Sequence, residues 1–249
     1  MSEPRFALVP LLSFLLMASP AAADPLSDLR AVLQRYPAKA RFVASASLLV
    51  KGQSDDAGAR AGSAKFRIKS DSDGFAVTTP PPALSAAASE ARRKKQDPDS
   101  PTPTRNAMVA LTVFDILDAV DVAAMLLNDL EGATLTSQTE SSFAGRPAKL
   151  LRIKVKPDLA GIRSKLVSEP AIELRVWLNQ AGVPVASERD ATYSASVLFV
   201  KAANVRKEHW DIAVAGDRLY ATRADQSNSA SAAGKTLASS RSVTYEVTR

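Results

Sequence analysis

The spacing of hydrophobic residues along the chain changes near Pro37. Upstream of Pro37 they recur every three or four positions, and Asp24 and Pro25 suit the N-cap and first turn of a helix. From Arg41 to Lys51 they alternate with other residues at every second position, which is typical of a strand. We therefore predict a helix followed by a strand. The residues on the apolar face of the helix are Leu26, Leu29, Leu33 and Tyr36.

The two-residue period dominates most of the remaining chain. Basic and apolar residues alternate from Lys65 to Lys69, and 74–79 is the expected hairpin partner. Turn residues occur at 145–147 and 181–184. Because short turns join consecutive strands, the pattern favours an antiparallel sheet. Further strands are predicted at 151–156, 172–179, 192–203, 208–215, 218–223 and 242–247.

A second helical segment is predicted from Ala107 to Leu130, with a break near Asp121 and an end before Gly132. Residues 80–106 contain three consecutive prolines and a charged cluster, and 225–240 are rich in Ser and Ala. Both segments are predicted to be long flexible loops. The predicted fold class is α+β: a curved antiparallel sheet, an incomplete β-barrel, covered on its concave face by two or three helices.

The N-terminus predicts export. Phe6 to Met17 is an apolar run followed by the small residues Ala21 to Ala23, which is typical of a cleaved signal peptide covering residues 1–23. The run is shorter than the roughly 20 residues that a membrane-spanning helix needs, so we expect no permanent membrane anchor. We predict a protein of the periplasm, or alternatively a secreted one, with a single β-rich domain at 24–249.

Composition excludes several classes of chemistry. The 249 residues include no Cys and one His, so disulfides, thiol nucleophiles, iron–sulfur clusters and sites with two His ligands are impossible. We expect no cofactor and no metal. Nucleic acid is not an expected partner despite the net charge of +6, because the chain is predicted to be exported and only 6% of it is aromatic.

Four residues remain as candidates for catalysis. Asp115, Asp118 and Asp121 are three residues apart on the predicted helix, where they could bind a cation or act as acid and base, or form a solvated face. His209 lies in a predicted strand without a nucleophile motif elsewhere, which favours a surface histidine. An enzyme would depend on these residues, and we predict that the protein is not one.

A basic cluster lies within the predicted loop 80–106. It could contact anionic lipid headgroups or an acidic partner, or it could be solvated without a partner. The candidate partner-binding or membrane-binding residues are Arg92, Arg93, Lys94 and Lys95.

The order of elements resembles a known family. A helix and long strand at Leu26–Lys51, a helical insertion at Leu111–Leu130, and strand and turn sequences at Phe143–Leu150 and Val176–Pro184 are similar to the LolA/LolB superfamily. This group includes periplasmic lipoprotein carriers and the N-terminal domain of the envelope-stress regulator RseB. The resemblance implies an incomplete antiparallel barrel whose apolar cavity accommodates acyl chains.

The apolar sides of the predicted strands are the candidate cavity. Small alanines on the first strand would leave space there, although the same residues could pack against the helices as a filled core. The candidate ligand-binding residues are Phe42, Ala44, Ala46, Leu48, Phe66, Ile68, Leu151, Ile153, Val155, Leu174 and Val176.

Two functions follow as hypotheses. The first is a carrier or sensor that binds a lipid or lipoprotein acyl chain without chemistry. The alternative is a cell-envelope interaction domain with a filled core, which recognises a protein partner through its basic loop.

Overall fold

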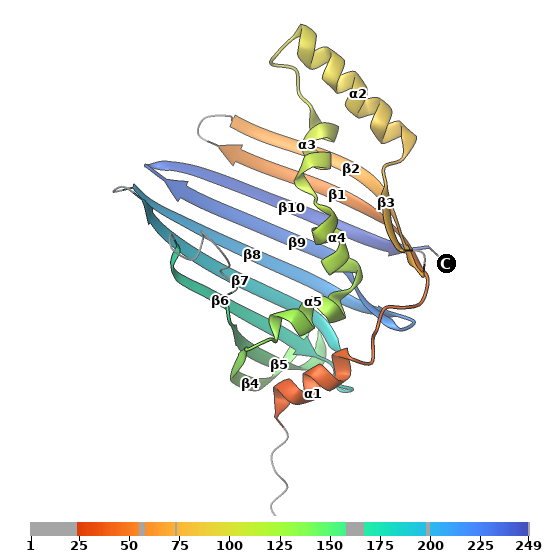
Figure 1. The fold of residues 1–249 in the computed structure, drawn as a ribbon, viewed down its shortest axis with the longest axis vertical. Helices are drawn as coiled ribbons and strands as arrows, with labels where there is room; N and C mark the ends of the chain where they lie inside the picture. The colour runs from red at the N-terminus through yellow and green to blue at the C-terminus, as the bar shows by residue number, and fades with distance from the viewer. Residues whose placement is uncertain (1–23, 55–57, 73, 158–166, 198–199, 249) are drawn as a thin grey trace, which may run out of the picture.

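The computed structural model describes residues 24–248 except 55–57, 73, 158–166 and 198–199. The predicted signal peptide at 1–23 lies outside the described residues. The described chain contains five helices and ten strands (Figure 1). The helices are α1 (Pro25–Leu33), α2 (Pro81–Gln96), α3 (Pro103–Ala110), α4 (Val113–Val120) and α5 (Val122–Asp129). The strands are β1 (Phe42–Ser54), β2 (Gly58–Asp71), β3 (Gly74–Thr78), β4 (Thr134–Phe143), β5 (Arg146–Val155), β6 (Val167–Leu178), β7 (Pro184–Val197), β8 (Val200–Ala215), β9 (Arg218–Ala232) and β10 (Lys235–Val247).

All ten strands form one antiparallel sheet in the order β3-β2-β1-β10-β9-β8-β7-β6-β5-β4. The last strand returns beside the first, so that Ala46 of β1 lies opposite Tyr245 of β10. The ends of this order, β3 and β4, are not paired with each other, so the sheet is not closed into a barrel. The predicted α+β class and antiparallel sheet are confirmed.

Helix α1 forms where the apolar spacing predicts it. The Asp24 side chain accepts a hydrogen bond from the Leu26 amide at 3.2 Å, and Pro25 occupies the first turn. Leu26, Leu29 and Leu33 are buried on one face. The helix therefore has both the cap and the apolar side that stabilise a short helix in a protein.

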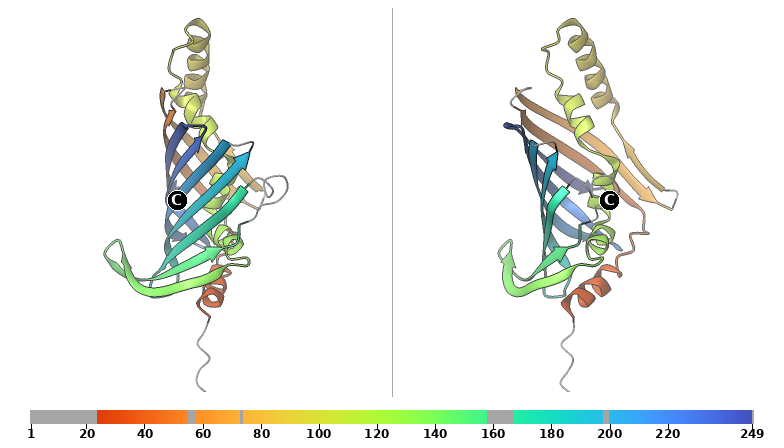
Figure 2. Two further views of the ribbon diagram at one scale, coloured as in Figure 1. Left: turned by 90° about the vertical axis from the view of Figure 1, so that its left-hand side faces the viewer. Right: turned by 60° about the vertical axis from the view of Figure 1, so that its left-hand side comes forward.

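Helices α3, α4 and α5 pack on one face of the sheet, which we call the inner face. Helix α3 contacts β1 and β2, while α4 and α5 contact β9 (Figure 2). The opposite, outer face carries charged side chains, such as Arg175 with Glu188 at 3.1 Å. Alternation along each strand therefore separates an apolar inner side from a polar outer side.

The predicted loop at 80–106 is wrong, because this segment contains α2 and the start of α3. Pro81 and Pro82 occupy the first turn of α2, where a missing amide hydrogen costs nothing, and an Ala-rich sequence follows. The five helices also exceed the two or three expected. The predicted helical segment from 107 to 130 is divided among α3, α4 and α5, and Asp121 caps α5 by accepting from the Ala124 amide at 3.1 Å. The predicted break near Asp121 is confirmed.

The predicted loop at 225–240 is also wrong, since β9 and β10 extend through it as a hairpin. Ser and Ala carry no strong strand signal, but the backbone of this part of β9 pairs with β8 and with β10. Similarly, the strand expected at 192–203 is divided between β7 and β8, and the polar edge strand β4 was not predicted. Strand formation here depends on neighbouring strands more than on local composition.

Candidate functional site

The eleven predicted ligand-binding residues share one buried core. Each is at most 7% exposed, and all pack in a single cluster with residues of α1, α3, α4 and α5. The helices therefore occupy the space that these residues face. Leu151 is the member that also lines the pocket described next.

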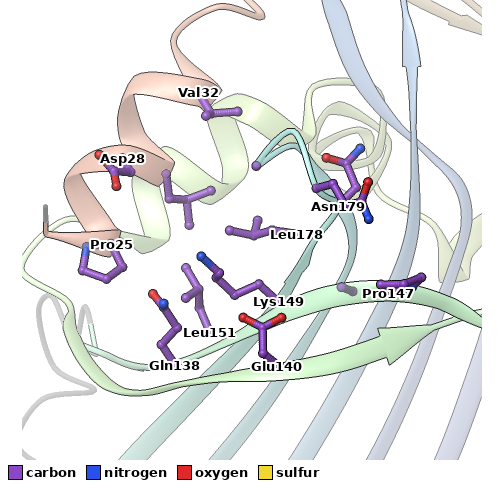
Figure 3. Close-up of a pocket in the computed structure, with 14 residues that line it drawn as sticks. Pro25, Asp28, Val32, Gln138, Glu140, Pro147, Lys149, Leu151, Leu178 and Asn179 are labelled. Atoms are coloured by element: carbon purple, nitrogen blue, oxygen red, sulfur yellow. The ribbon is translucent and has the colours of Figure 1, made fainter.

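A pocket of about 270 Å³ lies between α1, the strands β4, β5 and β6, and the turn after β6 (Figure 3). Its apolar wall includes Leu29 and Val32 of α1, Leu151 of β5 and Leu178 of β6. Gln138, Glu140 and Lys149 come from β4 and β5 on the opposite side (Figure 3). The remaining lining residues are Pro25, Asp28, Pro147, Ala148, Asn179, Gln180 and Gly182.

Two local interactions shape this pocket. Arg30 of α1 donates a hydrogen bond from Nη2 to the Leu130 carbonyl at 2.8 Å, which ties α1 to the end of α5. In the turn after β6, Asn179 Oδ1 accepts from the amides of Ala181 and Val183 at 2.9 and 3.0 Å. Gly182 completes the turn at a φ of +74°, a conformation that glycine adopts readily. The helix and the turn are therefore both held in place, and they approach each other where Gly182 lies beside Val32.

The pocket combines an aliphatic wall with polar and charged side chains. Its aliphatic wall favours a hydrocarbon group, and the polar side chains around it can solvate or pair with a polar end. Among the described residues, no group of three or more His, Asp or Glu side chains is placed to hold a metal ion. Sequence reasoning missed most of this pocket, since its residues come from elements more than 100 positions apart.

Two of the candidate catalytic acids stabilise helix N-termini: Asp115 belongs to the capping box of α4, whose N-cap is Thr112, and Asp121 is the N-cap of α5. The Asp115 carboxylate accepts from the Thr112 amide at 2.9 Å and also pairs with Arg241 of β10, at 2.7 Å between Oδ2 and Nη1. Burial opposes ionisation of Asp115, but the hydrogen bonds from Arg241 and Thr112 lower its pKa to about 2. Asp121 caps α5. Desolvation, and then the carboxylates of Asp115 and Glu208, raise the pKa of Asp118.

Asp129 is a buried acid that sequence reasoning missed. It is 5% exposed, and its Oδ1 lies 3.4 Å from Arg189 Nη2 of β7. The other oxygen, Oδ2, has no hydrogen-bond partner among the described residues. Burial raises the pKa of Asp129 to about 6, although Arg189 opposes this shift. The pair connects the end of α5 to the sheet.

His209 lies on the outer face, since its neighbour Trp210 is buried in the core. Its ring nitrogens lie 3.3 Å from Glu188 Oε1 and 3.1 Å from Asp211 Oδ1. The Phe143 ring is 6.3 Å away between centroids. His209 thus belongs to the outer-face charged network and lies apart from the pocket beneath α1.

The four basic residues Arg92 to Lys95 lie at the C-terminal end of α2, and all are exposed. The structure therefore places them on a helix and not in a loop. It does not bring them near the pocket residues (Figures 1 and 3).

Comparison with known proteins gives no relative: no protein-family model matches the chain, and no curated protein sequence matches it. Within the part of the chain that the structure describes, no helix has the length and apolar character needed to cross a bilayer.

Proposed function

We propose that this protein is a non-enzymatic periplasmic carrier or sensor that binds an acyl chain of a lipid or lipoprotein. The pocket beneath α1 is the observation that carries this proposal. An engineered apolar cavity of about 150 Å³ accepts benzene, so the pocket volume of about 270 Å³ accommodates a longer hydrocarbon fragment. The aliphatic residues Leu29, Val32 and Leu151 would contact the chain, and Lys149 could face its polar end.

In this proposal the fold is a LolA/LolB-like incomplete barrel with its helices on the concave face. Leu151 belongs both to the predicted cavity residues and to the pocket lining. The ligand would enter at the side of the sheet near β4, which contributes Gln138 and Glu140 to the lining. The other predicted residues would then support the pocket from within the core.

The second candidate function is an envelope interaction domain with a filled core. The apolar sides of the strands pack against the helices, and Ala46, Ile68 and Val176 are fully buried. This packing favours the filled core of the second candidate. In this case the exposed basic end of α2 would contact the partner.

Two tryptophan substitutions in α1 distinguish the carrier from the interaction domain. Val32 lines the pocket, whereas its neighbour Ala31 is exposed, so Val32→Trp fills the pocket and Ala31→Trp is the matched control. Binding is measured by displacement of an acyl-chain fluorophore and by native mass spectrometry of protein purified from the periplasm, followed by organic extraction.

We expect a stoichiometric lipid on the unmodified protein and on Ala31→Trp. We expect at least a tenfold weaker fluorophore affinity for Val32→Trp, because the indole would occupy the hydrocarbon position. If the unmodified protein carries no lipid and does not bind the fluorophore, the carrier proposal is rejected. Equal affinities of the two variants would place the ligand elsewhere.

A further inference from the structure

Helix α2 makes unusually little contact with the rest of the protein. Of its sixteen residues, Glu90 is the one that is buried. Figures 1 and 2 show the helix projecting beyond the β1–β2 side of the sheet. A helix of this length gains little stability by itself, and proteins normally stabilise helices by burying an apolar face. An exposed helix of this kind therefore needs another explanation than core packing.

The single buried residue fixes the direction of the helix. The two Glu90 carboxylate oxygens accept hydrogen bonds from the amides of Thr104 and Arg105, both at 3.0 Å. These amides are in the first turn of α3, where backbone donors lack partners within the helix. Glu90 therefore caps α3 and holds α2 in a defined orientation, with its C-terminal end pointing outwards.

That end carries Arg92, Arg93, Lys94 and Lys95. At 3.6 residues per turn, four consecutive side chains span about 300° around the axis, so the end of the helix is positive on nearly every side. Within the described residues, none of the four makes a salt bridge. The hydrogen bond from Arg92 Nη2 to Ser89 Oγ, at 3.0 Å, is local. Arg93 and Lys94 interact electrostatically with Glu90 and Asp97, but no salt bridge within the described residues occupies the four exposed cations, which are accessible to an external anion.

The acidic residues that follow, Asp97 and Asp99, offset part of this charge but form no salt bridge with the four cations among the described residues. Asp97 Oδ1 accepts from the Asp99 amide at 3.0 Å, and Asp97 Oδ2 accepts from the Ser100 hydroxyl at 2.9 Å. These bonds close the turn that returns the chain to α3. The Asp97 carboxylate is therefore held in the turn, where Lys94 interacts with it electrostatically without forming a salt bridge.

We propose that the basic end of α2 docks on an anionic phospholipid surface. The positive charge surrounds the helix end and is not confined to one face of the helix. Such an end can contact phosphates on all sides, as a continuous layer of lipid headgroups provides them. Between Ser85 and Pro101 there is no aromatic or large aliphatic residue, so arginine is the only one present of the residue types that dominate protein–protein interfaces. Basic residues near an anionic membrane, by contrast, bind through charge alone. The proposal is independent of the pocket beneath α1.

The test uses vesicles of phosphatidylcholine with and without about one-third phosphatidylglycerol, and measures cosedimentation of the full chain. Since basic residues contribute additively, replacing all four by Gln should reduce the partition coefficient by roughly a thousandfold. The matched control replaces four exposed cations of the outer face, Lys51, Lys65, Arg67 and Lys207, by Gln, and should change binding by less than about threefold. Circular dichroism confirms that each variant is folded.

A position-specific label makes the test independent of net charge. The chain has no Cys, so Gln96→Cys and Ser229→Cys each create a unique site for an environment-sensitive fluorophore. The label at 96 should shift to the blue on anionic vesicles, and this shift should disappear at about 1 M salt, where the screening length is only about 3 Å. The label at 229, on the outer face, should not shift.

Three outcomes would overturn the proposal. They are equal binding to vesicles with and without phosphatidylglycerol, equal losses in the two four-residue variants, and a shift at 229 without one at 96. Loss of binding to an acidic protein in the α2 variant, with vesicle binding unchanged, would assign this end of α2 to a protein partner instead.

Discussion

Arg241 of β10 and Asp115 of α4 are 126 residues apart in the chain and form a two-point ion pair. Arg241 Nη1 also donates to the Ala110 carbonyl at 2.8 Å, so one side chain holds the end of α3 and the start of α4. The side chains of both partners are less than one-fifth exposed. The pair therefore connects α3 and α4 to β10, the strand that is hydrogen-bonded to β1.

Asp115→Asn should destabilise the protein at neutral pH. The folded pKa of Asp115 is about 2, below the ordinary value of 3.8, so its contribution is complete above about pH 4 and is lost as the pH falls towards 2. We expect a loss of roughly 2 kcal/mol in the free energy of unfolding at pH 7 and almost none at pH 2. Urea unfolding at the two pH values measures this loss. The control is Asp99→Asn, at an exposed position. A loss independent of pH would contradict this role.

Asp129→Asn should have the opposite pH dependence. Because the folded pKa of Asp129 is raised to about 6, the folded state binds its proton more tightly than the unfolded state. This group therefore contributes most stability below about pH 4, and that contribution is lost as the pH rises to about 6. The free energy of unfolding of the unmodified protein should fall across this window by roughly 3 kcal/mol relative to Asp129→Asn. Parallel stability profiles for the two proteins from pH 4 to 7 would disprove the assignment.

Gly62→Ala should separate α3 from β2. A Cβ atom at this position would lie 2.2 Å from the Pro103 carbonyl oxygen and 2.9 Å from the Ala107 nitrogen, both of which are backbone atoms. The backbone must move to relieve this contact, so we expect a destabilisation of about 3 kcal/mol. The neighbouring exposed residue supplies the control, Ser63→Ala. A change no greater than that of the control would mean that α3 is not closely packed on β2.

Glu90→Ala should loosen α2 and the start of α3 without affecting the sheet. The Thr104 and Arg105 amides would lose their acceptor, which for a helix cap costs about 1 kcal/mol. Hydrogen exchange should accelerate at these two amides and remain unchanged in β5 and β6. Glu131→Ala, at an exposed acid, is the control. Unchanged exchange at Thr104 and Arg105 would show that the cap is not formed in solution.

Local sequence predicts the elements whose signals are self-contained. Helix α1 has its cap, its proline and its apolar face within ten residues, and the alternation in β1 and β5 indicates strands without reference to partners. The prediction of a loop in place of α2 is wrong because three consecutive prolines and a charged cluster are also typical of loops. The correct signal for α2 was the proline pair at the first turn, followed by residues of high helix propensity.

The candidate site was less predictable than the fold. The alternation along each strand identifies which side chains point into the core, and all eleven predicted ligand-binding residues are buried. The alternation does not indicate whether a helix or an empty cavity covers these side chains. The pocket lies at the side of the sheet near β4, where α1 meets the turn containing Gly182. Leu151 is the one predicted ligand-binding residue that lines it.

The sequence by itself determined the period of each main element and the division of most strands into an apolar and a polar side, because both depend on residues close together in the chain. Only the tertiary structure decided that β9 and β10 continue as strands through a Ser-rich and Ala-rich segment, since their backbone partners come from β8 and β1. It likewise decided where space remains between α1 and the sheet. Cavities result from the packing of distant segments, and local periodicity does not specify that packing.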